Sequence, residues 1–214
     1  MKKNFIIILL FLGIGSSLLT SCSSNDSEDV TTESIQSSTF TDLYAYKTNT
    51  SGNAVYTKFS FAKGDTLSTD ATDWDIAFSK TTIIVNGGND TIPYARSANG
   101  GLYKVSKSMS EITVADPTLI KGDSIGVKAL TTGSGNGWYE YIADKHVIYP
   151  ISGVTLVIKT HDGKYAKMEI DNYYKGNPAL SSIATTDAAG YYTFSYVYQP
   201  NSGSTSFTDS STSK

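Results

Sequence analysis

Few side chains in this sequence could take part in metal chemistry. The chain contains one cysteine, Cys22, and two histidines, His146 and His161. A single cysteine cannot build a disulfide framework, a zinc site of cysteines or an iron–sulfur centre. Two histidines leave little room for a histidine-rich metal site.

The carboxylates do not form an enzyme-like arrangement either. Asp73 and Asp75 fall on one side of an expected strand, and a glycosidase needs two carboxylates at a set separation. Nothing gives this pair an acid/base asymmetry, and Trp74 between them is expected to point inward. The sequence also lacks a serine nucleophile elbow and a glycine-rich phosphate loop between a strand and a helix. We therefore predict that the protein is not an enzyme.

Cys22 is explained by its position at the end of an export signal. A positive start, Met1–Lys3, precedes the apolar run Phe5–Ile14, so residues 1–21 are predicted to be a secretory signal peptide that is too short to span a bilayer. Leu19–Cys22 (LTSC) resembles the bacterial lipobox, which implies that Cys22 is lipidated. Several acyl chains on one residue give stable membrane anchoring.

Polar segments flank the rest of the chain. Residues 22–39 are acidic and almost free of large apolar side chains, which is typical of a flexible tether. Their acidic cluster resembles the export signal of surface-exposed lipoproteins in some Gram-negative bacteria, and it also suits a merely solvated linker. The Ser/Thr-rich residues 201–214 are predicted to be a disordered tail. Residues 40–200 remain as the folded domain.

The charge of the chain argues against a nucleic-acid partner. Its formal net charge is −3, only 17% of its residues are charged, and Arg96 is its single arginine. Proteins that bind phosphate backbones carry clustered Lys and Arg.

The folded domain is predicted to be all-β, with antiparallel sheets of short strands and hairpins and few or no helices. Thr, Val, Ile and Tyr recur in short runs that are separated by Gly, Asn, Asp and Pro. Only residues 109–113 and 178–183 allow a helical turn. The expected strands are 42–47, 55–60, 74–79, 82–86, 102–105, 137–142, 146–149, 154–160, 164–170 and 191–199.

One hairpin can be placed in register. A three-residue turn at His161–Gly163 pairs Leu156 with Met168 and Ile158 with Ala166, which keeps the apolar residues on one face, whereas a two-residue turn mixes the faces. Met168 is therefore expected to pack in the core. Residues Tyr192, Phe194, Tyr196 and Tyr198 share one face of the last strand, which predicts core packing or, alternatively, an aromatic platform for a ligand.

Several segments together resemble the HmuY-like haem-binding lipoproteins. The similarity covers roughly residues 40–200, and it is carried by strands and turns. The matching segments are Asp73–Phe78 (DWDIAF), Ile83–Gly88 (IIVNGG), Gly137–Tyr139, His146–Pro150, Ile158–Met168, Tyr173–Tyr174 and Tyr192–Tyr196.

This resemblance implies an all-β fold with a haem cleft formed by loops at one rim. It also implies a haem scavenger, lipid-anchored at Cys22 in the outer membrane, surface-exposed or released. The implied partners are haem and either a TonB-dependent outer-membrane receptor or a haem-carrying protein. The axial ligands of that family, His in some members and Met in others, cannot be aligned to this chain by motif.

The residues themselves offer His146, His161 and Met109 as candidate axial ligands of haem iron. In a meander of neighbouring strands, the turns that carry the two histidines lie at the same end of the sheet, so we expect both on one rim. Adjacent strands are only about 4.8 Å apart, so the loops must splay or one ligand must come from elsewhere. The stretch 99–118, which holds Met109, is a possible second wall.

Other functions remain open at this point. A lipoprotein of the same fold could bind a glycan through aromatic faces, act as an adhesin, or bind no haem at all.

Overall fold

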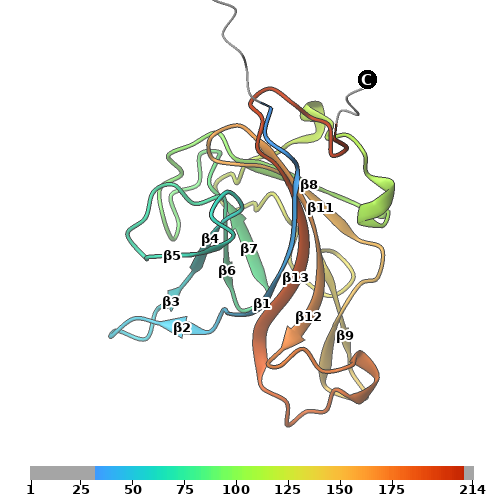
Figure 1. Ribbon diagram of the computed structural model, residues 1–214. Helices are drawn as coiled ribbons and strands as arrows, with labels where there is room; N and C mark the ends of the chain where they lie inside the picture. The colour runs from blue at the N-terminus through green and yellow to red at the C-terminus, as the bar shows by residue number, and fades with distance from the viewer. Residues whose placement is uncertain (1–31, 210–214) are drawn as a thin grey trace, which may run out of the picture. The chain divides into compact units, whose positions relative to one another are not determined.

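The structure, a computed structural model, describes residues 32–209 (Figure 1). Within this range thirteen strands form antiparallel sheets, and the helices are single 3-10 turns, which confirms the all-β prediction. The turns η1 (Met109–Glu111) and η3 (Leu180–Ser182) lie where helical turns were expected, and η2 (Pro117–Leu119) was not expected. None of the described helices has the length and apolarity that a bilayer crossing requires. The predicted signal peptide and Cys22 lie outside the described residues.

The larger sheet has five strands in the order β1-β13-β12-β11-β8. Its long central strands β12 and β13 pair along most of their length, and β1 and β8 form its edges (Figure 1). The strands are β1 (Gln36–Tyr44), β8 (Gly101–Val105), β11 (Thr155–Lys159), β12 (Tyr165–Tyr174) and β13 (Ala189–Gln199).

The β11–β12 hairpin confirms the predicted register. Leu156 pairs with Met168 and Ile158 with Ala166, and the loop closes between Thr160 and Lys164. Gly163 has a φ of 87°, which glycine adopts without strain. Met168 is fully buried, as expected.

A second sheet has four strands in the order β5-β4-β6-β7, and two small two-stranded sheets lie beside these. The four-stranded sheet consists of β4 (Thr57–Ser60), β5 (Asp65–Leu67), β6 (Ile76–Ser79) and β7 (Thr82–Val85). The small sheets pair β2 (Lys47–Thr48) with β3 (Ala54–Val55), and β9 (Tyr139–Ile142) with β10 (Val147–Pro150).

The inner faces of the two larger sheets share one hydrophobic core. Phe59 of β4 contacts Phe194 of β13 edge-to-face, with ring centroids 5.2 Å apart, and Phe78 of β6 stacks on the same ring at 5.7 Å. All four aromatic residues on the expected inner face of β13 are buried. They are core residues, and the alternative of a ligand platform on that face is wrong.

Both predicted domain boundaries need correction. Strand β1 begins at Gln36, inside the expected tether, because its residues pair with β13 through Gln36↔Tyr198. The expected disordered tail is ordered through residue 209, since Phe207 is buried and its backbone N–H donates to Thr113. The apolar ring of Phe207 holds a segment whose Ser/Thr-rich composition alone predicts disorder.

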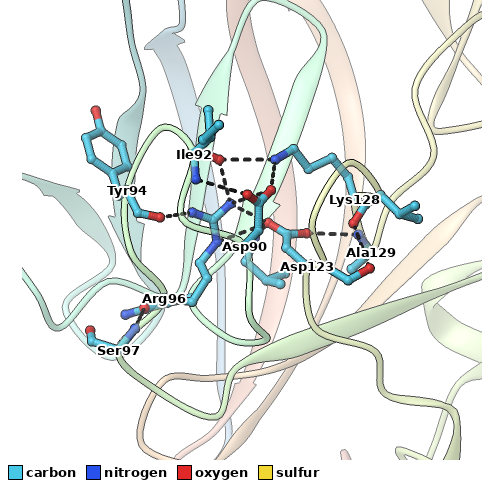
Figure 2. Close-up of polar contacts among 12 residues, drawn as sticks. Asp90, Ile92, Tyr94, Arg96, Ser97, Asp123, Lys128 and Ala129 are labelled. Atoms are coloured by element: carbon cyan, nitrogen blue, oxygen red, sulfur yellow. Dashed lines mark hydrogen bonds and ion pairs between the residues drawn. The ribbon is translucent and has the colours of Figure 1, made fainter.

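The single arginine is buried in a polar cluster that fixes two long loops (Figure 2). Arg96 donates through Nε and Nη2 to Oδ2 of Asp123, at 3.2 and 2.7 Å, and both side chains are fully buried. Asp123 also accepts backbone N–H bonds from Val85 at the end of β7 and from Ala129. Lys128 bonds to the neighbouring Asp90 and holds the pKa of that carboxyl below its ordinary value. Arg96 is therefore a structural residue.

The glycines of the IIVNGG segment serve the same cluster. Gly88 has a φ of 99°, and a Cβ atom there would lie 1.9 Å from the backbone oxygen of Asp123. A Cβ on Gly87 would lie 1.8 Å from the oxygen of Gly100. These positions admit only glycine because three backbone segments meet there.

Candidate functional site

His161 lies at the tip of the β11–β12 hairpin, where it is bound to a buried carboxylate. Its backbone N–H and its ring Nδ1 both donate to Oδ1 of Asp75, at 2.9 and 2.7 Å. The His161 side chain is 25% exposed, and that of Asp75 is 1% exposed. The hairpin tip is thus fixed to the residue that precedes β6.

Asp75 joins the two larger sheets. Its second oxygen, Oδ2, accepts the backbone N–H of Phe61 at 2.8 Å, just after β4. Three hydrogen bonds from two segments therefore satisfy a carboxylate that would be costly to bury alone. The hydrogen bond to Asp75 raises the pKa of the His161 imidazole above its ordinary value, against the opposing effect of burial.

This geometry leaves Nε2 of His161 as a free ligand atom. No residue between 32 and 209 makes a hydrogen bond with Nε2, and a carboxylate on Nδ1 is the usual partner of a metal-binding histidine because it fixes the tautomer and the ring. Asp162 lies close enough to share a cation with His161 and Asp75. However, Lys164 is 3.2 Å from Asp162, and both oxygens of Asp75 already accept hydrogen bonds. The carboxylates of Asp75 and Asp162 thus already have partners, and the site offers a metal one ligand, the imidazole of His161.

The stability of the protein should depend on pH through this pair. Because the folded-state pKa of His161 is raised, the pair contributes fully below the unfolded value, about 6.5, and its contribution is lost as pH rises through the folded-state pKa. We expect urea midpoints of the native protein to exceed those of His161→Gln by more at pH 5.5 than at pH 8.5. A difference that is constant between these pH values would contradict a protonated His161 in the fold.

His146 lies at the tip of the β9–β10 hairpin and is exposed. Its backbone has a φ of 51°, and its Nδ1 is 2.7 Å from the hydroxyl of Tyr141. This contact orients the imidazole, but unlike that of His161 it involves a neutral, exposed partner.

The expectation that both histidines share one rim is wrong. Strand β10 pairs only with β9 among the described strands, and Ile148 of β10 donates to the hydroxyl of Tyr174 at the end of β12. His161 lies beside the start of β12, and a ten-residue strand spans about 30 Å. After segment 151–153 the chain does not turn back to pair β11 with β10. Instead, β10 lies beside the end of β12 and β11 pairs with its start. The two histidines therefore lie at opposite ends of β12.

Met109 lies in a third place. Its backbone N–H donates to Glu169, and its carbonyl accepts from Nζ of Lys167 at 2.8 Å, so η1 covers the middle of β12. Lys167 and Glu169 face away from the core that holds Met168. The structure brings none of the three candidates His146, His161 and Met109 together.

The role of Asp75 was missed in the sequence. Asp75 was considered only as a possible catalytic carboxylate, although it is the partner of His161, and Asp73 instead pairs with Lys63 at the surface. Trp74 points inward, as expected, and is 2% exposed. Alternation in DWD places both carboxylates on one side of a strand, so it could not have indicated that Asp75 is buried and Asp73 exposed.

Comparison with known proteins gives one family and several solved structures. A profile of the HmuY protein family matches residues 52–196, more than half of the chain. An apo HmuY analog of Tannerella forsythia aligns over 79% of this chain and 99% of its own, at 14% identity and a TM-score of 0.44. A candidate lipoprotein of Bacteroides fragilis aligns over 68% of this chain and 85% of its own, at 14% sequence identity and a TM-score of 0.42. A candidate HmuY-like heme-binding protein of Bacteroides vulgatus aligns over 77% of this chain and 93% of its own, at 15% sequence identity and a TM-score of 0.42. No curated protein sequence matches.

Proposed function

The chain belongs to the HmuY family, and on that premise we propose that it is a haem-binding lipoprotein that captures haem at the cell surface. In this proposal Cys22 carries the lipid anchor in the outer membrane. The captured haem passes to a TonB-dependent outer-membrane receptor, or is taken from a haem-carrying protein. No catalytic step is part of the proposal.

The observation that carries the proposal is the His161–Asp75 pair. Haem iron accepts an imidazole as an axial ligand. His161 fits that role because its Nε2 is free and its Nδ1–H donates a hydrogen bond to the buried carboxylate of Asp75. Ligation by His161 and His146 of the same chain does not fit, because they lie at opposite ends of β12. We therefore propose His161 as the iron ligand, and Asp75 as the residue that holds its ring.

Titration with haemin tests this assignment. We expect a saturable shift of the Soret band for the native protein and its loss in His161→Ala, because the imidazole supplies the bond to iron. His146→Ala and Met109→Ala, whose residues lie elsewhere, should bind haemin like the native protein.

Circular dichroism of the three variants controls for folding. A flat titration of the native protein with both oxidised and reduced haem would refute haem binding. A spectrum that is unchanged in His161→Ala but altered in His146→Ala or Met109→Ala would refute the choice of ligand.

A further inference from the structure

A pocket lined with tyrosines lies beside the start of β13, and its Tyr94 reaches Trp74, the neighbour of Asp75, with ring centroids 6.5 Å apart. It is a shallow pocket, wide open to solvent, of about 800 Å³ between the end of β1, the β2–β3 hairpin and the loop that holds Tyr94. We call it the tyrosine pocket. Its lining residues are Tyr44, Tyr46, Lys47, Thr48, Asn49, Thr50, Val55, Thr69 and Tyr94. Tyr44 pairs with Tyr191 at the start of β13, whereas His161 lies near the end of that strand, where Gln199 pairs with Tyr165.

The tyrosine rings of the pocket pack against other residues on the side that faces away from the pocket. Tyr44 packs on Tyr191 with centroids 4.8 Å apart, and Tyr94 contacts Tyr56 edge-to-face at 6.2 Å. Tyr46 lies against the backbone of Gly190, where a Cβ atom would come within 1.9 Å of the ring. Tyr44 and Tyr46 nevertheless remain 38% and 41% exposed. These two aromatic surfaces are therefore pre-positioned and still open to solvent.

The lining combines aromatic rings with many hydrogen-bonding groups. Eight of the nine lining residues carry a side-chain hydroxyl, amide or ammonium group, and only Val55 is purely apolar. None of these nine residues is His, Met or Cys, so the pocket holds none of the candidate iron ligands His146, His161 and Met109. A sugar ring presents an apolar C–H face, which packs on tyrosine, and a rim of hydroxyls that need hydrogen-bond partners.

The charge of the lining narrows the ligand further. Lys47 is the one charged lining residue, and none is Asp or Glu. Lys58 is buried behind Tyr94, with Nζ 4.5 Å from that ring and bonded to the carbonyls of Thr69 and Ala71, so Lys47 is the cation that a bound carboxylate would meet. We propose that the tyrosine pocket binds a saccharide that carries a carboxylate, at a site separate from that of haem.

An array of neutral and acidic oligosaccharides, probed with the purified protein, tests this proposal. Binding to uronate- or sialate-containing saccharides is expected, with affinities then measured by calorimetry. Tyr44→Ala should weaken binding by about tenfold, because one aromatic contact is lost. Val55→Trp should abolish binding, since the added ring fills the pocket without removing any lining tyrosine.

Matched variants make the result specific. Lys47→Ala should lower affinity for the acidic saccharide, whereas Lys121→Ala, which removes an exposed lysine elsewhere, should not. His161→Ala should retain saccharide binding, so the haem and saccharide proposals can fail independently. No binding to any arrayed saccharide, binding of neutral saccharides alone, or loss of haemin binding in Val55→Trp would overturn the proposal.

Discussion

Replacing Asp123 with alanine is expected to destabilise the protein by about 3–5 kcal/mol, because it leaves a buried guanidinium without its counter-charge. Arg96 and Asp123 are both fully buried, and Arg96 donates to Asp123 through two nitrogens. The backbone N–H groups of Val85 and Ala129 lose their acceptor as well. Urea unfolding of the native protein and of Asp123→Ala at pH 7, analysed with one m-value, measures the loss of unfolding free energy.

Two further variants separate the buried pair from charge effects in general. Asp73→Ala removes an ion pair with Lys63 whose side chains are about half exposed, and it should change stability by less than about 1 kcal/mol. The double variant Arg96→Met/Asp123→Leu should recover the part of the loss that comes from the unpaired guanidinium, because apolar side chains tolerate burial, while the N–H groups of Val85 and Ala129 remain without their acceptor. Equal losses for Asp123→Ala and Asp73→Ala would contradict this account.

Asp75→Ala is expected to cost about 3 kcal/mol, because the backbone N–H groups of Phe61 and His161 would each lose a charged acceptor in a buried place. His161→Ala should cost less, since the bond between Asp75 and Phe61 survives. The order of the two urea midpoints checks this prediction. Asp162→Ala, at an exposed neighbour in the same hairpin, is the control and should have a small effect.

Haem affinity gives the pair a second readout. Asp75→Asn keeps the shape of the side chain but removes its charge, and residues that orient a metal ligand typically contribute 10–100-fold to affinity. We expect a loss of haemin affinity of about that size with the Soret band retained. Unchanged affinity in a folded Asp75→Asn protein would show that Asp75 is purely structural.

Alternation within strands made much of the sheet architecture predictable. The β11–β12 register follows from keeping Leu156 and Met168 on one face, and the buried face of β13 follows in the same way. Such arguments succeed because one face of each strand must be apolar wherever it covers the core.

The candidate site was less predictable because its contacts join distant segments. His161 and Asp75 are 86 residues apart, and Arg96 and Asp123 are 27 apart, so no local pattern pairs them. The shared-rim expectation assumed that β10 pairs with β11, whereas β10 pairs with β9 and contacts Tyr174 instead. Alternation defines the faces of a strand, but it does not define the neighbours of that strand.

Pairing of β1 with β13 joins the first described strand to the last one. Glu33 and Asn201 exchange hydrogen bonds across a separation of 168 residues, and Gln36 pairs with Tyr198. Contacts so far apart in sequence require closing a long loop before they stabilise anything, and proteins dominated by them fold in milliseconds to seconds. Because β13 follows every other described strand in the sequence, the larger sheet cannot be completed until β13 has left the ribosome. The β1–β13 and β12–β13 pairings therefore form only after the whole of β13 has been synthesised.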